Sequence, residues 1–131
     1  MFPIGIAFAL ILIGTVTAAD APIPVEIWRG GDDGSTVKLY DALESAFNSS
    51  PEFTVTSAGN GTLIVTIQNH VEVRRKFWRK RIYYNVEFAT KNNQQISQSQ
   101  GSCWKSSVTK CANDVLKDAK SAATKLSREK Q

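Results

Sequence analysis

Residues 62–90 read TLIVTIQNHVEVRRKFWRKRIYYNVEFAT, and the predicted architecture follows from their pattern. Apolar side chains recur at alternate positions in two rows, Leu63, Val65, Ile67, Val71 and Val73, then Ile82, Tyr84, Val86 and Phe88. A period of two predicts strands, because successive side chains of a strand point to opposite faces. We therefore expect a long β-hairpin with one apolar face. Asn69 interrupts the first row, which predicts a bulge or twist near Asn69 and His70.

The centre of this stretch is strongly cationic. Six cations surround two aromatic side chains in the run Arg74, Arg75, Lys76, Phe77, Trp78, Arg79, Lys80 and Arg81. Such a cluster can bind phosphates of lipids, nucleic acids or teichoic-type polymers, while the rings stack on a base or enter a membrane interface. Alternatively, the hairpin keeps these charges in water, where they discourage pairing with other strands. We predict a binding surface formed by these eight residues.

The segments before the hairpin predict two strands separated by a helix. Alternating side chains predict strands over 25–29 and 53–57. The helix between them can be capped by Ser35 or Thr36 and is stopped by Pro51. Its apolar positions follow helical spacing, at Leu39, Leu43, Ala46 and Phe47.

Two further elements follow the hairpin. Residues 95–102 are polar at almost every position, which is typical of a short edge strand in contact with water. A last helix, capped by Ser106 or Ser107, carries one apolar stripe formed by Val108, Cys111, Ala112, Val115, Leu116, Ala119, Ala122, Ala123 and Leu126.

The predicted element order is β-α-β-β-β-β-α. It indicates an α+β fold in which two helices pack on one face of a mixed, mostly antiparallel sheet of about five strands. The initial strand, helix and strand favour a parallel crossover. Asn60 and Gly61 form a dipeptide typical of hairpin turns.

The first nineteen of the 131 residues predict export. Met1–Ala19 has no charged side chain, and it ends in small residues at Thr17, Ala18 and Ala19. We interpret residues 1–19 as a signal peptide, with a retained membrane anchor as the alternative. Residues 20–131 are then a single domain, secreted or periplasmic.

Cys103 and Cys111 are predicted to form a disulfide in this oxidising compartment. Eight residues along one α-helix span about 12 Å, beyond the ~7 Å Cα separation that a disulfide can bridge. Cys103 is therefore expected to lie outside the helix that contains Cys111. A redox or catalytic role is disfavoured because the spacing is not C-x-x-C.

The net charge of +4 is unevenly distributed along the chain. Residues 20–70 carry −5, residues 71–81 carry +5 and residues 82–131 carry +4. The positive charge is thus concentrated at the hairpin tip and in the last helix, which is information about partners rather than about fold.

Other candidate sites are weaker. Gly30–Gly34 matches neither a dinucleotide nor a Walker motif, and Asp32 and Asp33 would repel a phosphate. These two acids instead suit a turn and the helix dipole, and their spacing does not fit a calcium loop. His70 is the sole histidine and cannot form a closed zinc site. We therefore predict no catalytic residue, cofactor or metal.

The predicted element order and signal peptide resemble the small α/β modules of bacterial envelope proteins, such as the amino-terminal domain of TolB and the penicillin-binding-protein activators. The resemblance extends over Val25 to Leu126. It rests on the order of the elements, so it assigns no functional residue in this chain. It implies a non-enzymatic contact surface. We accordingly expect a secreted or periplasmic accessory protein of the envelope that binds an anionic component or a partner protein. A membrane surface is also a candidate partner, and nucleic acid is a weaker candidate. The alternatives are a protein-directed inhibitor or immunity-type protein and a small hydrolase.

Overall fold

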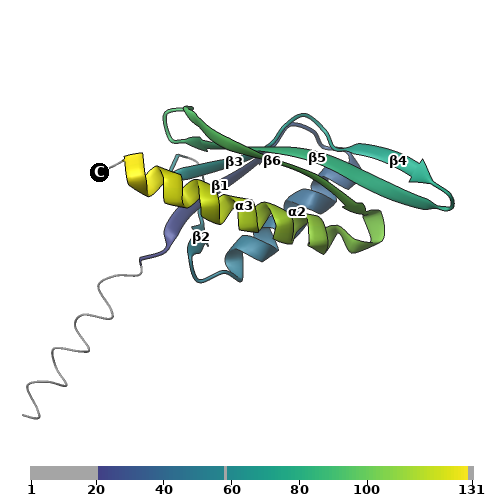
Figure 1. The fold of residues 1–131 in the computed structure, drawn as a ribbon, viewed down its shortest axis with the longest axis horizontal. Helices are drawn as coiled ribbons and strands as arrows, with labels where there is room; N and C mark the ends of the chain where they lie inside the picture. The colour runs from purple at the N-terminus through teal and green to yellow at the C-terminus, as the bar shows by residue number, and fades with distance from the viewer. Residues whose placement is uncertain (1–20, 58, 130–131) are drawn as a thin grey trace, which may run out of the picture.

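The computed structural model describes residues 21–57 and 59–129, so the predicted signal peptide lies outside the described residues. Both helices lie on one face of a single sheet, whose other face is open (Figure 1). This arrangement confirms the predicted α+β fold. The elements in chain order are β1 (Ile23–Arg29), α2 (Gly34–Asn48), β2 (Phe53–Val55), β3 (Leu63–Ile67), β4 (Glu72–Lys76), β5 (Arg79–Thr90), β6 (Gln95–Trp104), a 3₁₀ turn (Lys105–Ser107) and α3 (Val108–Glu129).

The sheet is mixed, as predicted. β1 pairs in parallel with β2 and with β3, which confirms the parallel crossover through α2. β5 pairs antiparallel with β3 and β4 along one edge and with β6 along the other. The described sheet has six strands rather than about five, because the first arm of the predicted hairpin is divided into β3 and β4.

The hairpin is interrupted where Asn69 breaks the apolar row. β3 ends at the pair Ile67 and Val86, and β4 resumes at the pair Glu72 and Tyr83. Residues 68–71 therefore lie opposite residues 84–85, and Asn69 adopts a positive φ of 55°. An irregularity was predicted here, and it takes the form of a break between two strands.

The break is attached to the start of α2. Asp33 caps this helix through its carboxylate, which accepts from Thr36 N at 3.2 Å and from Thr36 Oγ1 at 2.8 Å. Thr36 Oγ1 in turn accepts a hydrogen bond from Val71 N at 2.9 Å. The sequence-based cap, Ser35 or Thr36, is therefore wrong, because Asp33 reaches the free backbone amide first. Gly30 is required beside the break, since a Cβ there would lie 2.6 Å from Asn69 N.

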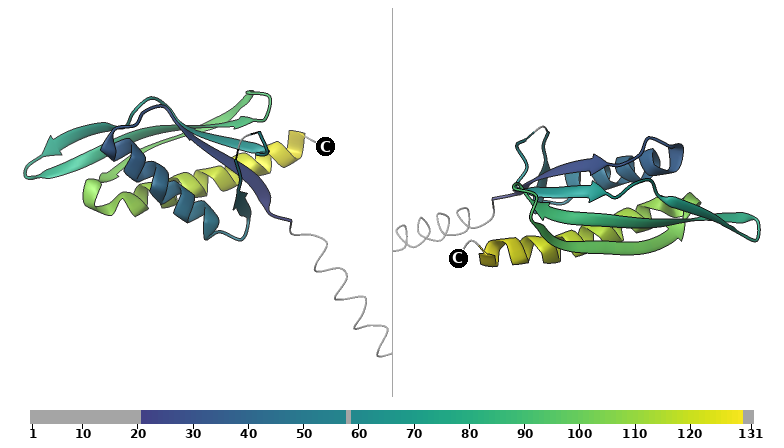
Figure 2. Two further views of the ribbon diagram at one scale, coloured as in Figure 1. Left: turned by 180° about the vertical axis from the view of Figure 1, so that it is seen from behind. Right: turned by 90° about the horizontal axis from the view of Figure 1, so that it is seen from above.

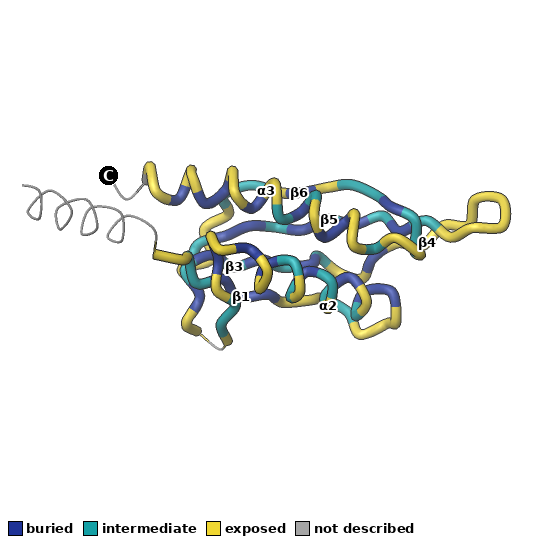
Figure 3. The backbone as a smooth tube through the Cα atoms, turned by 90° about the horizontal axis from the view of Figure 1, so that it is seen from below, coloured by how far each residue is buried: buried dark blue, intermediate teal, exposed yellow. Residues whose placement is uncertain are grey.

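The core lies between the two helices and the inner face of the sheet. Its largest fully buried side chains include Leu39 and Phe47 of α2 and Phe88 of β5. The burial colouring in Figure 3 shows that the buried part of the sheet ends before the hairpin tip. Val73 was predicted to face inward, yet it is 39% exposed, whereas its cross-strand neighbour Ile82 is fully buried.

The segment between β2 and β3 crosses the open face of β1. The two strands flank β1 on opposite sides, so the Asn60-Gly61 dipeptide does not form the predicted hairpin turn. Glu26, only 6% exposed, holds the crossing segment with one carboxylate oxygen, Oε1, which accepts from Gly59 N at 2.9 Å and Gly61 N at 3.3 Å. Its other oxygen accepts from Trp28 Nε1 at 2.5 Å. The Asn-Gly signal is overridden because the buried glutamate offers these amides an acceptor.

The predicted disulfide is confirmed. It joins Cys103 at the end of β6 to Cys111 in the first turn of α3, with the Cα atoms 5.7 Å apart. Cys103 thus lies outside the helix, as the spacing required. Within the described residues, no helix is both long and apolar enough to cross a membrane.

Replacing both cysteines with serine is expected to lower the free energy of unfolding by about 2 to 3 kcal/mol, because the closed loop no longer restricts the unfolded chain. Urea denaturation of the wild-type protein and the double variant, each with and without reductant, measures this difference. Reductant should destabilise only the wild-type protein. Equal midpoints for the oxidised protein and the double variant would show that the bond contributes nothing to stability.

Candidate functional site

The predicted cationic run forms the projecting end of the sheet. β4 and the first residues of β5 extend past the helices as a two-stranded ribbon, seen at the end of the molecule in Figures 1 and 2. Every residue of β4 is exposed, and the turn presents Phe77 and Trp78 at 86% and 83% exposure. The structure therefore brings all eight predicted residues together on one free tip, which we call the basic tip (residues 74–81).

The pairing of the strands places like charges directly opposite one another. The register joins Arg74 to Arg81, Arg75 to Lys80 and Lys76 to Arg79. Like charges facing each other across antiparallel strands are destabilising. Since side chains alternate between faces, the first and third pairs share the open face with Trp104, and the middle pair points to the helix side. The basic tip is thus cationic on both faces, and each of its three cross-strand pairs is repulsive.

Three of the arginines make cation–π contacts with aromatic side chains. The guanidinium of Arg79 lies 3.9 Å from the ring centre of Trp104, and that of Arg81 lies 4.9 Å from the same ring. Arg74 lies 4.7 Å from the ring centre of Tyr83 and donates to Glu72 at 2.8 Å. These contacts orient the cations without neutralising those over Trp104.

The turn residue Phe77 has an unfavourable backbone conformation. Its φ is 60°, in the left-handed region that favours glycine, and it occupies the first position of a two-residue hairpin turn. A bulky side chain in this region is a genuine outlier. Because the ring contacts solvent rather than the core, the fold gains little from it.

A cleft beneath the basic tip adds cations that sequence reasoning missed. It has a volume of about 420 Å³ and is lined by Lys38, Trp78, Arg79, Lys80, Lys105 and Ser106. Lys38 comes from α2 and Lys105 from the turn before α3. None of these described lining residues is acidic. No spacing rule relates Lys38 or Lys105 to the hairpin, so only the packing of the helices could reveal them.

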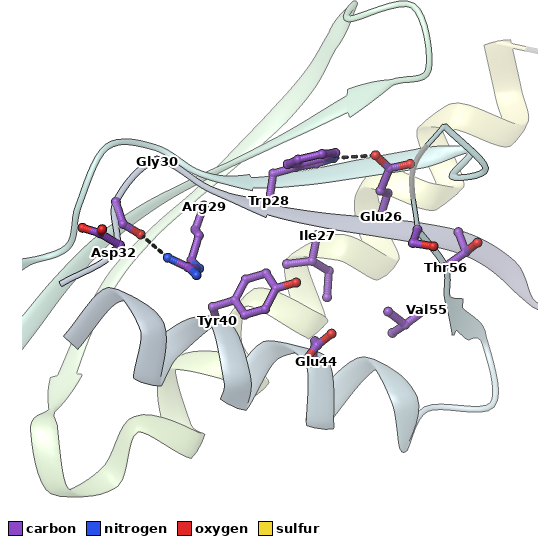
Figure 4. Close-up of a pocket in the computed structure, with 12 residues that line it drawn as sticks. Glu26, Ile27, Trp28, Arg29, Gly30, Asp32, Tyr40, Glu44, Val55 and Thr56 are labelled. Carbon is purple, nitrogen blue, oxygen red and sulfur yellow. Dashed lines mark hydrogen bonds between the residues drawn. The ribbon is translucent and has the colours of Figure 1, made fainter. Parts of the chain in front are cut away.

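A second and larger cleft lies along β1, away from the basic tip. Its volume is about 620 Å³, and Figure 4 shows the labelled side chains that surround it, from β1, from α2 and from the end of β2. No pattern in the sequence indicates this cleft, because it exists only where β2 stops short of the end of β1.

The remaining candidate residues, His70 and Asp33, lie near each other at the start of α2. His70 is exposed in the break between β3 and β4 rather than within a strand, and its Nδ1 lies 3.2 Å from Val71 O. The nearby Asp33 is engaged as the cap of α2, and the hydrogen bond from Thr36 lowers the pKa of its carboxyl. In the described part of the chain, no three His, Cys, Asp or Glu side chains are grouped to hold a metal ion.

The comparisons with known proteins define a fold and leave the family open. No protein-family model and no curated protein matches the sequence. Among solved structures, a minor lipoprotein from Acinetobacter baumannii is similar, with a TM-score of 0.59 and 6% identity over 80% of this chain and 94% of that chain. A PelC dodecamer from Paraburkholderia phytofirmans gives a TM-score of 0.49 and 12% identity over 70% and 80%. At these identities the similarity extends to the fold alone.

The class of protein is therefore an α+β module with a projecting basic hairpin. This fold is shared with the protein described as a minor lipoprotein. The narrower resemblance to TolB and to the penicillin-binding-protein activators stays a prediction.

Replacing Phe77 with glycine should raise the free energy of unfolding by about 1 kcal/mol, because glycine adopts a positive φ without steric cost. The matched control is Trp78→Gly, at the neighbouring position of the same turn, where φ is not positive. This control should leave stability unchanged or lower it. Urea denaturation compares the two, and an equal loss in both variants would contradict the strained conformation of Phe77.

Proposed function

We propose that the protein is a non-enzymatic binding or accessory protein of the cell envelope that contacts an anionic envelope component through its basic tip. The observation that carries this proposal is the register of the tip, in which three consecutive cross-strand pairs each join two cations. A partner that carries negative charge would relieve the repulsion within these pairs. The exposed rings of Phe77 and Trp78 extend the same surface with apolar contact area.

The alternative interpretation, in which the cations only prevent pairing with other strands, does not account for their number and placement. Lysines on an edge strand can prevent association, but a few charges are sufficient for that purpose. Here six cations lie on both faces of the ribbon, and Lys38 and Lys105 extend the positive surface beneath it. This concentration favours a function that requires positive charge.

The proposed location is supported by one prediction, the signal peptide, and by two observations that agree with it. The predicted signal peptide and the disulfide both suit an oxidising, exported environment. The fold is shared with a bacterial protein described as a minor lipoprotein. We infer a secreted or periplasmic protein, for which anionic lipids and phosphate-containing polymers are available partners and nucleic acid is a weaker one.

Neutralising part of the basic tip should weaken binding to vesicles that contain anionic phospholipid. The variant Arg75→Gln, Lys76→Gln, Lys80→Gln removes three cations and leaves those that stack on Trp104. Each cation near an anionic surface contributes about 1 kcal/mol, so the three together should lower the affinity roughly a hundredfold at low salt. Vesicle co-sedimentation in low and high salt measures this change.

The matched control removes the same charge elsewhere, as Lys91→Gln, Lys117→Gln, Lys125→Gln. These three lysines are exposed on the β5–β6 turn and on α3. The control should bind nearly as the wild-type protein does. Equal weakening in both variants would mean that only net charge matters, and unchanged binding in the tip variant would exclude the tip as the contact surface.

A further inference from the structure

The outer edge of β1 carries unpaired backbone groups. Backbone groups of a strand alternate between its two edges. Ile23 N donates to Glu52 O at 2.9 Å and Val25 O accepts from Thr56 N at 2.8 Å, so the odd-numbered residues point toward β2. On the opposite edge, Gly30 N donates to Ile67 O at 2.9 Å, beside β3. The N–H and C=O groups of Ile27 and Arg29 therefore point toward the side of β2.

β2 does not reach these groups. It ends at Val55, which is opposite Val25, whereas β3 pairs with β1 as far as Arg29. No hydrogen bond within the described residues reaches the backbone of Ile27 from the β2 side. The edge from Ile27 to Arg29 thus opens into the cleft of about 620 Å³, with Val55, Thr56 and Ser57 at one end and Gly31 and Asp32 at the other.

The wall opposite this edge is formed by α2. Tyr40 and Glu44 are half-buried there, and Figure 4 shows both projecting toward β1. The guanidinium of Arg29 lies 5.5 Å from the ring centre of Tyr40 and donates to Gly31 O at 2.8 Å. Partial burial and the neighbouring Glu44 raise the pKa of the Tyr40 hydroxyl, which as an ordinary phenol is already a hydrogen-bond donor at neutral pH.

The charge of the cleft is opposite to that of the basic tip. Glu26, Asp32 and Glu44 line it together with one cation, Arg29. The carboxylate of Glu26 is already engaged with Trp28 and the crossing segment, so Asp32 and Glu44 are the acids that face an incoming group. A cationic side chain is the complement of these two acids.

We propose that this cleft binds an extended segment of a partner polypeptide, which adds to the sheet beside Ile27 and Arg29 as a strand in line with β2 and places a basic side chain near Glu44 or Asp32. Only an extended polypeptide offers donors and acceptors at the ~7 Å repeat that separates these two residues. Main-chain hydrogen bonds would supply affinity, and the pocket beside Tyr40 would supply specificity. About three to five residues would fit along the free edge. This site is separate from the basic tip and does not depend on the proposed function.

The test replaces a single backbone donor. Arg29→Pro removes the N–H that points into the cleft and places a ring there, while the opposite edge of the strand can still pair with β3. Arg29→Ala is the matched control, because it removes the same side chain and keeps the N–H. The probes are heptapeptides selected from a random display library on the intact protein, resynthesised with a fluorophore, and measured by anisotropy.

The selected peptides should contain alternating apolar residues and at least one lysine or arginine. Their affinity should be at least tenfold lower with Arg29→Pro than with Arg29→Ala, because both variants lack the arginine side chain and only the proline variant lacks the N–H. Glu44→Gln should weaken the binding of basic peptides several-fold. Amide hydrogen exchange gives a second readout on the wild-type protein, in which peptide binding should slow the exchange of the Ile27 and Arg29 amides.

Four results would overturn the proposal. The selection could yield no binding peptide, or the peptides could bind Arg29→Pro as tightly as the wild-type protein. The peptides could also leave the exchange of the Ile27 and Arg29 amides unchanged. Self-association that is lost only in Arg29→Pro, measured by sedimentation, would assign the edge to a second copy of the chain and would contradict a foreign partner.

Discussion

β5 is longer than the layer of helices that covers it, and the form of the molecule follows from this mismatch. From Ile82 to Phe88 the alternate side chains of β5 are buried in the hydrophobic core. From Arg79 to Arg81 the strand has lost this cover and pairs with β4, whose five residues are all exposed. Apolar residues cannot be stabilised on a ribbon without a core beneath it. The same strand therefore changes from core to solvated hairpin within a few residues.

A second mismatch in length occurs at β1, where the neighbouring strand β2 is too short to cover the edge. This strand pairs with β3 from Val25 to Arg29, but β2 accompanies it only as far as Val25. The chain crosses the open face at this point, where Glu26 provides acceptors for the amides of Gly59 and Gly61. One edge of β1 is consequently left free beside α2. The fold thus presents a cationic hairpin tip and, separately, a strand edge in an acidic cleft.

Much of the fold could be predicted from local pattern. The alternation of Leu63 to Phe88 predicted the hairpin, the helical spacing of Leu39 to Phe47 predicted α2, and the spacing of the cysteines placed Cys103 outside α3. Each of these signals depends on a period or a length within one element. The exposure of Val73 was not predictable in this way, because it depends on where the helices end relative to the ribbon.

Features that depend on contacts between distant segments escaped sequence reasoning. The Asn60-Gly61 dipeptide has the chemistry of a hairpin turn, but a buried acceptor more than thirty residues earlier in the chain redirects it. Lys38 and Lys105 join the basic tip only through packing, and the free edge of β1 results from the short length of β2. The grouping of the eight tip residues was predictable because their charge density is visible in the sequence itself.

The most direct measurement of the central claim is the vesicle affinity of a shortened protein in which residues 74–81 are replaced by Asn-Gly. Val73 and Ile82 are a cross-strand pair, so a two-residue turn can close the ribbon there. The account predicts a protein that unfolds cooperatively, with a free energy of unfolding within about 1 kcal/mol of the wild-type value, and no salt-sensitive binding to anionic vesicles. A folded, shortened protein that still binds these vesicles with wild-type affinity would contradict it.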